Sequence, residues 1–581
     1  MAQLRYPRPS TRKWEHLPWE LRHMVLGQVA TASSSRAGYA CVCRDWQVFF
    51  ETRNFSCLVL NASDLSDLRQ IVVGRRRELV KHIALHVKLG PYTYTEEPAD
   101  KTCDENHSAF TNAIWGLWEV LSTWRRKRDV NGNNNGQLTL ELLAECPTDI
   151  SMFNPGRLYS SKIDLYSSYL HRNSLEVYKR HCGAYFQPAN SRKSWIVWEM
   201  EQTDPAIYRD LWRHHKRTIL NEGTLKLNFS YLPSHQTKRR RRLPQVDVVT
   251  NFLVRREYYR NIDPGSLRQI FQSLPQLKSI NLERSIYINA TDERDWNKGI
   301  LESLLLPIPH LPPSPGGNDS ASSSPRLSMS RAALPDSLKR LTLFAEARES
   351  FHKQSAMPVA KNTHPNMAKS LVTLSRNLQQ LSVSFLIDAE DFFRSSLYWP
   401  TAASDEGGEK GEELYRHRLD HEPRWEHLTS LALTSKRLIM PQPSSSSWMS
   451  RINDLLFAAA VTAKMMPKLE VMEIWNGDKG QAGIFRYVSG SPNESTSAEI
   501  VWQGTQQQQH LALSERVLKA WREVALEHNP RCGLSLSVSM IPIEPTSIEG
   551  AAYVLDYLRL GKLVMHEVSA WQGQWEQRLR P

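Results

Sequence analysis

The chain has 581 residues and a formal net charge of +12 at pH 7, with 40% hydrophobic and 23% charged residues. This composition excludes a wholly disordered chain, and the length suggests roughly two to four domains or one long repeat array. No apolar run approaches the roughly 18–20 residues of a membrane-spanning helix, and no apolar segment of a secretory signal follows the basic N-terminus. Seven cysteines without framework spacing predict free thiols in the cytoplasm or the nucleus.

Residues 14–58 are predicted to form a compact domain of short helices, after a disordered tail at residues 1–13. In the first helix Leu17, Leu21 and Val25 recur at helical spacing, although other apolar side chains point to different sides. Helices this short cannot bury all of their apolar groups within one small domain. We therefore expect a partner to cover the remaining apolar surface. The alternative is a helical cap that packs on the following residues of the same chain.

The first part of an α/β body is predicted for residues 59–306. Apolar residues alternate in its expected strands, and they recur every three or four residues in its expected helices. The elements expected first are a strand at 57–60, a helix near 64–73 with an Asp cap, a strand at 81–89, a helix at 108–126 and a strand at 138–145.

Several stretches are too poor in apolar residues to offset the entropy cost of ordering. Residues 307–333 form a Pro/Ser-rich segment that is predicted to be a disordered insertion. Flexible loops are expected near residues 401–423 and 441–447.

The C-terminal body, residues 334–581, continues a Leu-x-x-Leu-x-Leu pattern that begins near residue 274. In units of this kind a short strand directs its leucines inward and a helix covers them. The stretches GSLRQIFQSLPQ and WMSRINDLLFAAAVTAKMMPK are predicted covering helices. Because the spacing is irregular, the pattern predicts degenerate leucine-rich repeats, with an ordinary α/β domain as the alternative. The pattern recurs at 274–282, 338–343, 378–383, 428–433 and 469–474.

A dense basic run is a candidate nuclear-import patch. A solvated loop is the simpler interpretation, and nucleic-acid binding is the third. The run consists of Lys238, Arg239, Arg240, Arg241 and Arg242.

The N-terminal helices carry an ordered motif: Leu-Pro-x-Glu-Leu, then an aliphatic pair, then Val-Cys-Arg-x-Trp. The matching residues are Leu17, Pro18, Glu20, Leu21, Val25, Leu26, Val42, Cys43, Arg44 and Trp46. This motif resembles an F-box. The layout of the body is similar to that of large fungal F-box proteins with degenerate leucine-rich repeats and an uncharacterised C-terminal domain.

The resemblance implies a substrate-recognition adaptor of an SCF-type cullin–RING ubiquitin ligase. The F-box would dock on the Skp-type adaptor, and through it on cullin, while the repeat body would bind an unknown protein substrate. The connecting loop, TASSSRAG, departs from the usual F-box pattern. By this resemblance the adaptor-binding residues are Leu17, Pro18, Glu20, Leu21, Val25, Val42, Cys43 and Trp46.

No catalytic, metal or cofactor site is predicted. Cys41 and Cys43 lack a second pair at the spacing of zinc ligands. No nucleophile and base occur in a recognisable arrangement, so we expect a subunit without catalytic activity of its own. The alternatives are an interaction scaffold outside any ligase and, with less support, a basic nucleic-acid-associated protein.

Overall fold

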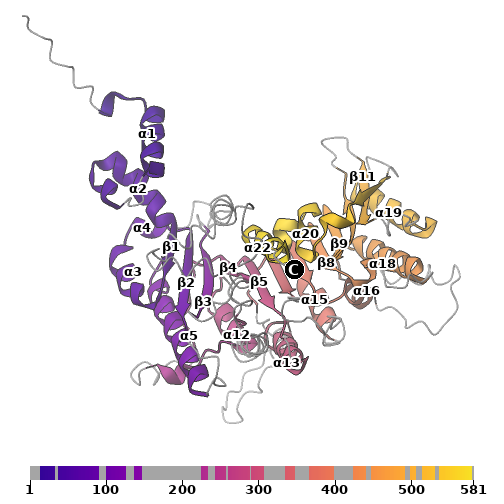
Figure 1. The fold of residues 1–581 in the computed structure, drawn as a ribbon, viewed down its shortest axis with the longest axis horizontal. Coiled ribbons are helices and arrows are strands. Elements are labelled where there is room, and N and C mark those ends of the chain that lie inside the picture. Colours follow the sequence, from indigo (N-terminus) through magenta and orange to yellow (C-terminus); the bar gives the residue numbers. More distant parts are fainter. Residues whose placement is uncertain are drawn as a thin grey trace, which may run out of the picture.

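The computed structural model shows a mixed α/β protein with a helical N-terminal region (Figure 1). It describes residues 14–32, 37–90, 100–125, 137–146, 224–232, 242–256, 260–287, 290–305, 334–346, 366–397, 423–439, 447–490, 497–505, 513–529 and 536–578.

Twelve strands form a single sheet in the described part of the chain, and their order in the sheet is their order in the sequence. Neighbouring strands are parallel except around β10, which runs antiparallel to both β9 and β11. The strands are β1 (Cys57–Leu60), β2 (His82–Lys88), β3 (Thr139–Glu145), β4 (Asn251–Val254), β5 (Ser279–Ser285), β6 (Arg340–Glu346), β7 (Gln380–Ser384), β8 (Ser430–Thr434), β9 (Val471–Asp478), β10 (Gln481–Val488), β11 (Ala498–Thr505) and β12 (Leu536–Ile543).

The residue that precedes each strand from β5 to β9 occupies an equivalent position in the stack. The backbone N–H of Lys339 donates to Lys278 O, and that of Gln379 donates to Lys339 O, both at 2.8 Å. In the same way, the N–H of Thr429 donates to Gln379 O, and the N–H of Glu470 donates to Thr429 O, again at 2.8 Å each. The parallel part of the sheet is therefore a stack of similar strand–helix units, each of which contacts its neighbours.

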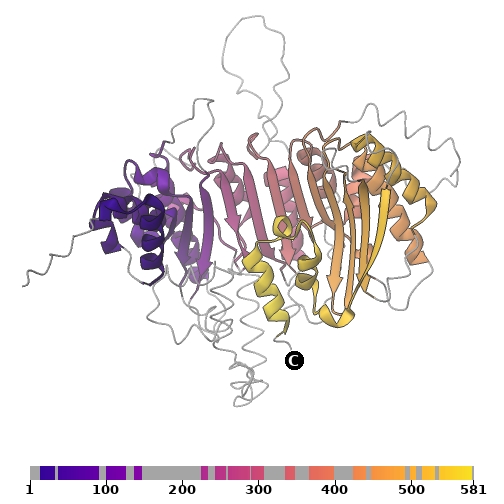
Figure 2. The same cartoon turned by 90° about the horizontal axis from the view of Figure 1, so that it is seen from above.

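Helices cover one face of this sheet (Figures 1 and 2). Their apolar sides pack on the inward side chains of the strands and form the main core. These helices are α3 (Leu65–Ile71), α5 (Asp100–Leu121), α12 (Pro264–Gln272), α13 (Ala290–Ile300), α15 (Met367–Ser375), α16 (Ala389–Leu397), α18 (Ser447–Ala463) and α19 (Glu515–His528).

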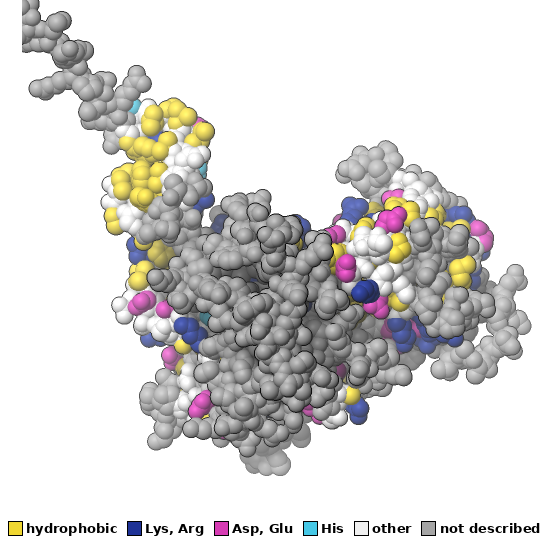
Figure 3. Space-filling model, in the orientation of Figure 1, with side chains coloured by type: hydrophobic (Ala, Val, Ile, Leu, Met, Phe, Trp, Pro, Cys, Tyr) yellow, Lys and Arg dark blue, Asp and Glu magenta, His cyan; other side chains and the backbone are white. Residues whose placement is uncertain are grey.

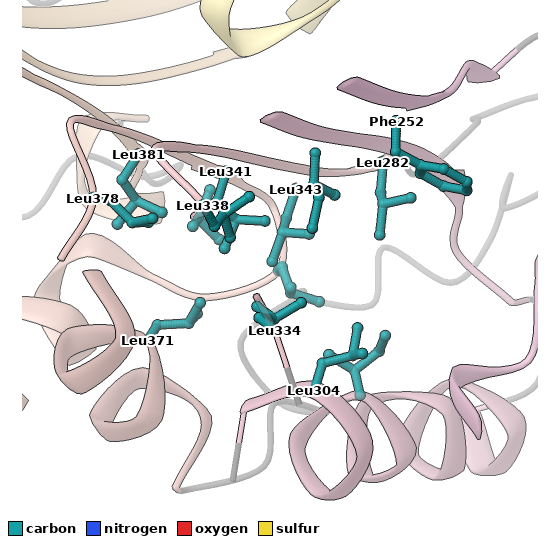
Figure 4. Packing of buried hydrophobic residues seen from close by; sticks show 14 of the residues in the cluster. Phe252, Leu282, Leu304, Leu334, Leu338, Leu341, Leu343, Leu371, Leu378 and Leu381 are labelled. Atoms are coloured by element: carbon teal, nitrogen blue, oxygen red, sulfur yellow. The ribbon is translucent and has the colours of Figure 1, made fainter. Parts of the chain in front are cut away.

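The leucines of the predicted repeats build this core (Figure 4). Leu341 on β6 lies between Ile280 on β5 and Leu381 on β7 in the strand register, and all three are fully buried or nearly so. In two units a tryptophan also donates to a serine at a helix end. Trp118 Nε1 donates to Ser273 Oγ at 2.7 Å, and Trp425 Nε1 donates to Ser375 Oγ at 2.8 Å.

The C-terminal segment, residues 544–578, turns back across the other face of the sheet (Figure 2). Its apolar side chains form a second core with the strands there, which includes Phe344, Trp475, Val554 and Leu558. The segment contains α20 (Ala551–Val554), α21 (Gly561–Val564) and α22 (Glu567–Arg578).

The α/β class and the N-terminal helices are confirmed, and the strands expected at 57–60, 81–89 and 138–145 are β1, β2 and β3. β1 shows that the sheet begins within the predicted helical domain. The Asp cap differs in detail, because Asn61 and Asp64 form a reciprocal capping box one turn before α3. The hairpin of β9 and β10, with its turn at Lys479–Gly480, was not predicted.

The predicted tail and the insertion at 307–333 lie outside the described residues, as do nearly all of the two predicted loops. No helix in the described part of the chain combines the length and the apolar character needed to span a bilayer.

Candidate functional site: an exposed apolar face on the N-terminal helices

The N-terminal helical unit consists of α1 (Trp19–Ala32), α2 (Arg44–Ser56) and two short 3₁₀ helices, Trp14–His16 and Ala37–Cys41. It extends from one end of the sheet, and α1 is the helix farthest from the body (Figure 1). The proline of the motif, Pro18, precedes the first residue of α1, where its missing N–H leaves no helical hydrogen bond unmade.

A small core holds the unit together. Its buried members are Leu26 and Ala30 of α1 with Phe49 and Phe50 of α2. The Arg22 guanidinium of α1 also pairs with the Asp45 carboxylate of α2. Four buried side chains are few for two helices, so most of the remaining apolar surface of the unit faces outward.

The outer side of the unit is apolar and exposed, and hydrophobic side chains dominate its surface in Figure 3. Met24 is 66% exposed and Leu21 47%, although both side chains are large and apolar. Exposed apolar residues gathered on one side of a protein mark a site of interaction. We call this set the outer face: Leu17, Leu21, Met24, Val25, Val42 and Val48.

Four of the predicted adaptor-binding residues lie on the outer face: Leu17, Leu21, Val25 and Val42. Pro18, Glu20 and Cys43 are exposed as well.

Trp46 differs from the other predicted residues because it is half-buried and contributes to the core of the unit. Its ring centroid lies 5.8 Å from those of Trp14 and Tyr39, and 5.6 Å from that of Phe50. Trp46 therefore supports the unit from within, and only part of its ring is available at the surface.

The prediction missed Met24 and Val48 as members of the outer face. Met24 could have been found from the sequence, because it follows Leu21 by three residues and so shares its side of the helix. Val48 lies on α2, and only the packing of the two helices shows that it is exposed.

The joint between the unit and the sheet is polar and closely packed. α2 ends at Ser56 and β1 begins at Cys57, so no linker separates them. The guanidinium of Arg76, in α4 (Arg76–Leu79), donates to Glu51 Oε1 from Nε at 3.1 Å and from Nη2 at 2.7 Å. Burial alone would raise the pKa of Glu51, but the hydrogen bonds and charge of Arg76 outweigh it and lower the pKa below 4.5.

The face of the sheet opposite the main helices is not an open groove over its central strands. Glu473 Oε1 and Oε2 of β9 accept the backbone N–H groups of Arg559 and Leu560 at 2.9 and 2.8 Å. Glu283 Oε1 of β5 accepts the N–H of His566 at 2.7 Å, and burial raises the pKa of Glu283. The C-terminal segment thus occupies the surface on which a repeat protein would most simply bind a partner.

The predicted basic run falls almost wholly outside the part of the chain that the structure describes. Lys238, Arg239, Arg240 and Arg241 lie outside the described residues, and Arg242 is exposed. Among the residues that the structure describes, no three His, Cys, Asp or Glu side chains are grouped so that they could hold a metal ion.

Residues 333–566 are similar to a family of unknown function, DUF6546. No curated protein matches the chain. The matched region extends from just before β6 to His566, beyond the end of α21, so it includes strands β6–β12 and much of the segment that covers them. The outer face lies outside this region.

Proposed function

We propose that the chain is the substrate-recognition adaptor of an SCF-type ubiquitin ligase, which docks on the Skp-type adaptor through the outer face. One observation carries this proposal: residues that match the F-box motif coincide with an exposed apolar surface on a helical unit outside the body. The chain itself is a non-catalytic subunit in this account. The other members of the complex perform ubiquitin transfer, and the protein acts in the cytoplasm or the nucleus.

The exposed apolar area of the outer face is large enough to account for the affinity expected for the adaptor. Leu21 is 47% exposed and Val25 is 42% exposed, so docking would remove about half of each side chain from water. Full burial of such a side chain contributes about 1.5–3 kcal/mol. Several half-exposed anchors therefore supply several kcal/mol, which suits a helix that docks in an apolar groove.

The body is proposed to bind the target, as degenerate leucine-rich repeats do in the F-box proteins that this chain resembles. Because the C-terminal segment covers the central strands, we place the target-binding surface elsewhere on the body. The strand ends and the helical side of the stack are the remaining candidates.

The test is a pull-down of the full-length protein with purified Skp-type adaptor. In the variant Leu17→Asp, Leu21→Asp, docking would bury two carboxylates in an apolar groove, and we expect binding to be lost. The matched control is Ile71→Asp, Val73→Asp, which places the same charges at two other half-exposed aliphatic residues. Wild type and control should bind equally. Failure of the folded wild type to bind would leave the unit as a cap on the sheet.

A further inference from the structure

β12 forms the end of the sheet, and its outer side is unpaired in the described part of the chain. It pairs with β11 along its whole length, from Leu536 opposite Ala498 to Ile543 opposite Thr505. The backbone N–H and C=O groups on the other side of an eight-residue strand can pair with a further strand.

The side chains of β12 are unusually exposed for apolar residues of a sheet. Val538 is 44% exposed, Met540 42% and Ile541 43%. Leu536 is half-buried against the main core, and Ile543 is buried in the second core, so both ends of the strand are anchored. The middle of β12 therefore presents an apolar edge from a fixed position.

The sequence of β12, LSVSMIPI, contains no charged residue. Natural edge strands commonly carry lysine or another charge that prevents pairing with a second chain. Pro542 is the one residue of β12 that would interrupt further pairing, and it lies next to the end of the strand. Hence only the last part of the edge is protected.

We propose that β12 pairs antiparallel with β12 of a second copy of this chain, which makes the protein a symmetric dimer. With the twofold axis at Ser539, Val538 lies opposite the partner's Met540, and Ser539 lies opposite the partner's Ser539. Serine and apolar residues alternate in the first part of β12, so in this register the apolar side chains of both strands lie on one face of the sheet and the serines on the other. No like charges meet at the pairing site.

Geometry favours a closed dimer over a filament. Pairing of an edge with its own copy about a twofold axis uses the edge in both chains and leaves none to extend the assembly. β12 is the last strand of the sheet, and the helical unit with the outer face extends from the β1 end (Figure 1), so both outer faces of the dimer remain free. The inference is independent of the proposed function.

The oligomeric state of the full-length protein is the first test. At ~50 µM and moderate salt, which screens the net charge of +12, sedimentation equilibrium should give twice the 66.9 kDa of one chain. Val538→Lys, Met540→Lys should give the monomer mass, because lysines would face each other across the axis. Ile71→Lys, Val73→Lys adds the same charge elsewhere and should remain dimeric. A monomeric wild type, or a dimeric β12 variant, would overturn the proposal.

Cross-linking tests the register without relying on a loss of association. Directly opposite residues in antiparallel strands are about 4.5–5.5 Å apart at Cα, which is within the range of a disulfide. Ser539→Cys should thus give a covalent dimer on mild oxidation, in excess of any formed by the wild-type cysteines. Ser537→Cys is the control. In this register residue 537 lies opposite the partner's residue 541, so the two introduced thiols would be offset by four residues along the strands, about 13 Å. Equal cross-linking of both variants would contradict the register.

Discussion

At the scale of single residues, buried carboxylates attach the C-terminal segment to the sheet. Glu473 is fully buried, pairs with Arg486 and accepts two backbone N–H groups of the segment. Such a group stabilises the protein only while all of these partners are present, because an unpaired charge in the interior is strongly unfavourable.

We expect Glu473→Gln to lower the free energy of unfolding by about 3 kcal/mol or more, because it removes the charge opposite Arg486 and replaces an acceptor with a donor. Chemical denaturation of the full-length protein measures this change. The matched control is Glu515→Gln, whose pair with Arg522 is largely exposed and should contribute less than about 1 kcal/mol. Equal effects of the two substitutions would show that Glu473 is not an anchor.

At the scale of elements, α20 lies directly on β9 because Gly477 leaves room for it. A Cβ atom at Gly477 would lie 2.3 Å from Val554 Cγ2 and 3.1 Å from the Cα atom of Ala551. The backbone of α20 cannot move away without opening the second core. This contact explains why a glycine is suited to a position near the end of the strand.

Gly477→Ala is therefore expected to lower the free energy of unfolding by about 1–3 kcal/mol, as overpacked sites do. Gly27→Ala is the control, because a Cβ atom there meets no other atom within 4 Å and α1 should gain up to about 1 kcal/mol of helix stability. Thermal unfolding of both variants provides the comparison. A stability for Gly477→Ala at or above that of the wild type would contradict the packing described.

Sequence periodicity predicted the elements whose apolar side chains face one side. The strands at 57–60 and 138–145 were predicted closely, because a short apolar run marks the first and alternating aliphatic residues mark the second. β10 was missed because pattern alone does not show that a strand turns back on its predecessor. Nor does any local signal show that the C-terminal segment crosses the sheet, since its partners such as Phe344 lie some 200 residues earlier.

At the scale of the whole molecule, the sheet separates two surfaces with different properties. The helical unit with the outer face projects from the β1 end of the sheet (Figure 1), and β12 is the last strand at the other end. Four residues of the outer face were predicted because the motif gave their identity. Trp46 was assigned by the same motif, but its half-buried position depends on the rings of Trp14 and Tyr39, which pattern alone does not place.

Hydrogen–deuterium exchange of the full-length protein, with and without purified Skp-type adaptor, tests the central claim most directly. We expect slower exchange in α1 and in the first turns of α2 when the adaptor is present, because docking stabilises these helices against local opening. Exchange in β5–β9 should not change. If the adaptor leaves α1 and α2 unaffected, or slows exchange only within the body, the outer face is not the docking surface and the proposed function is contradicted.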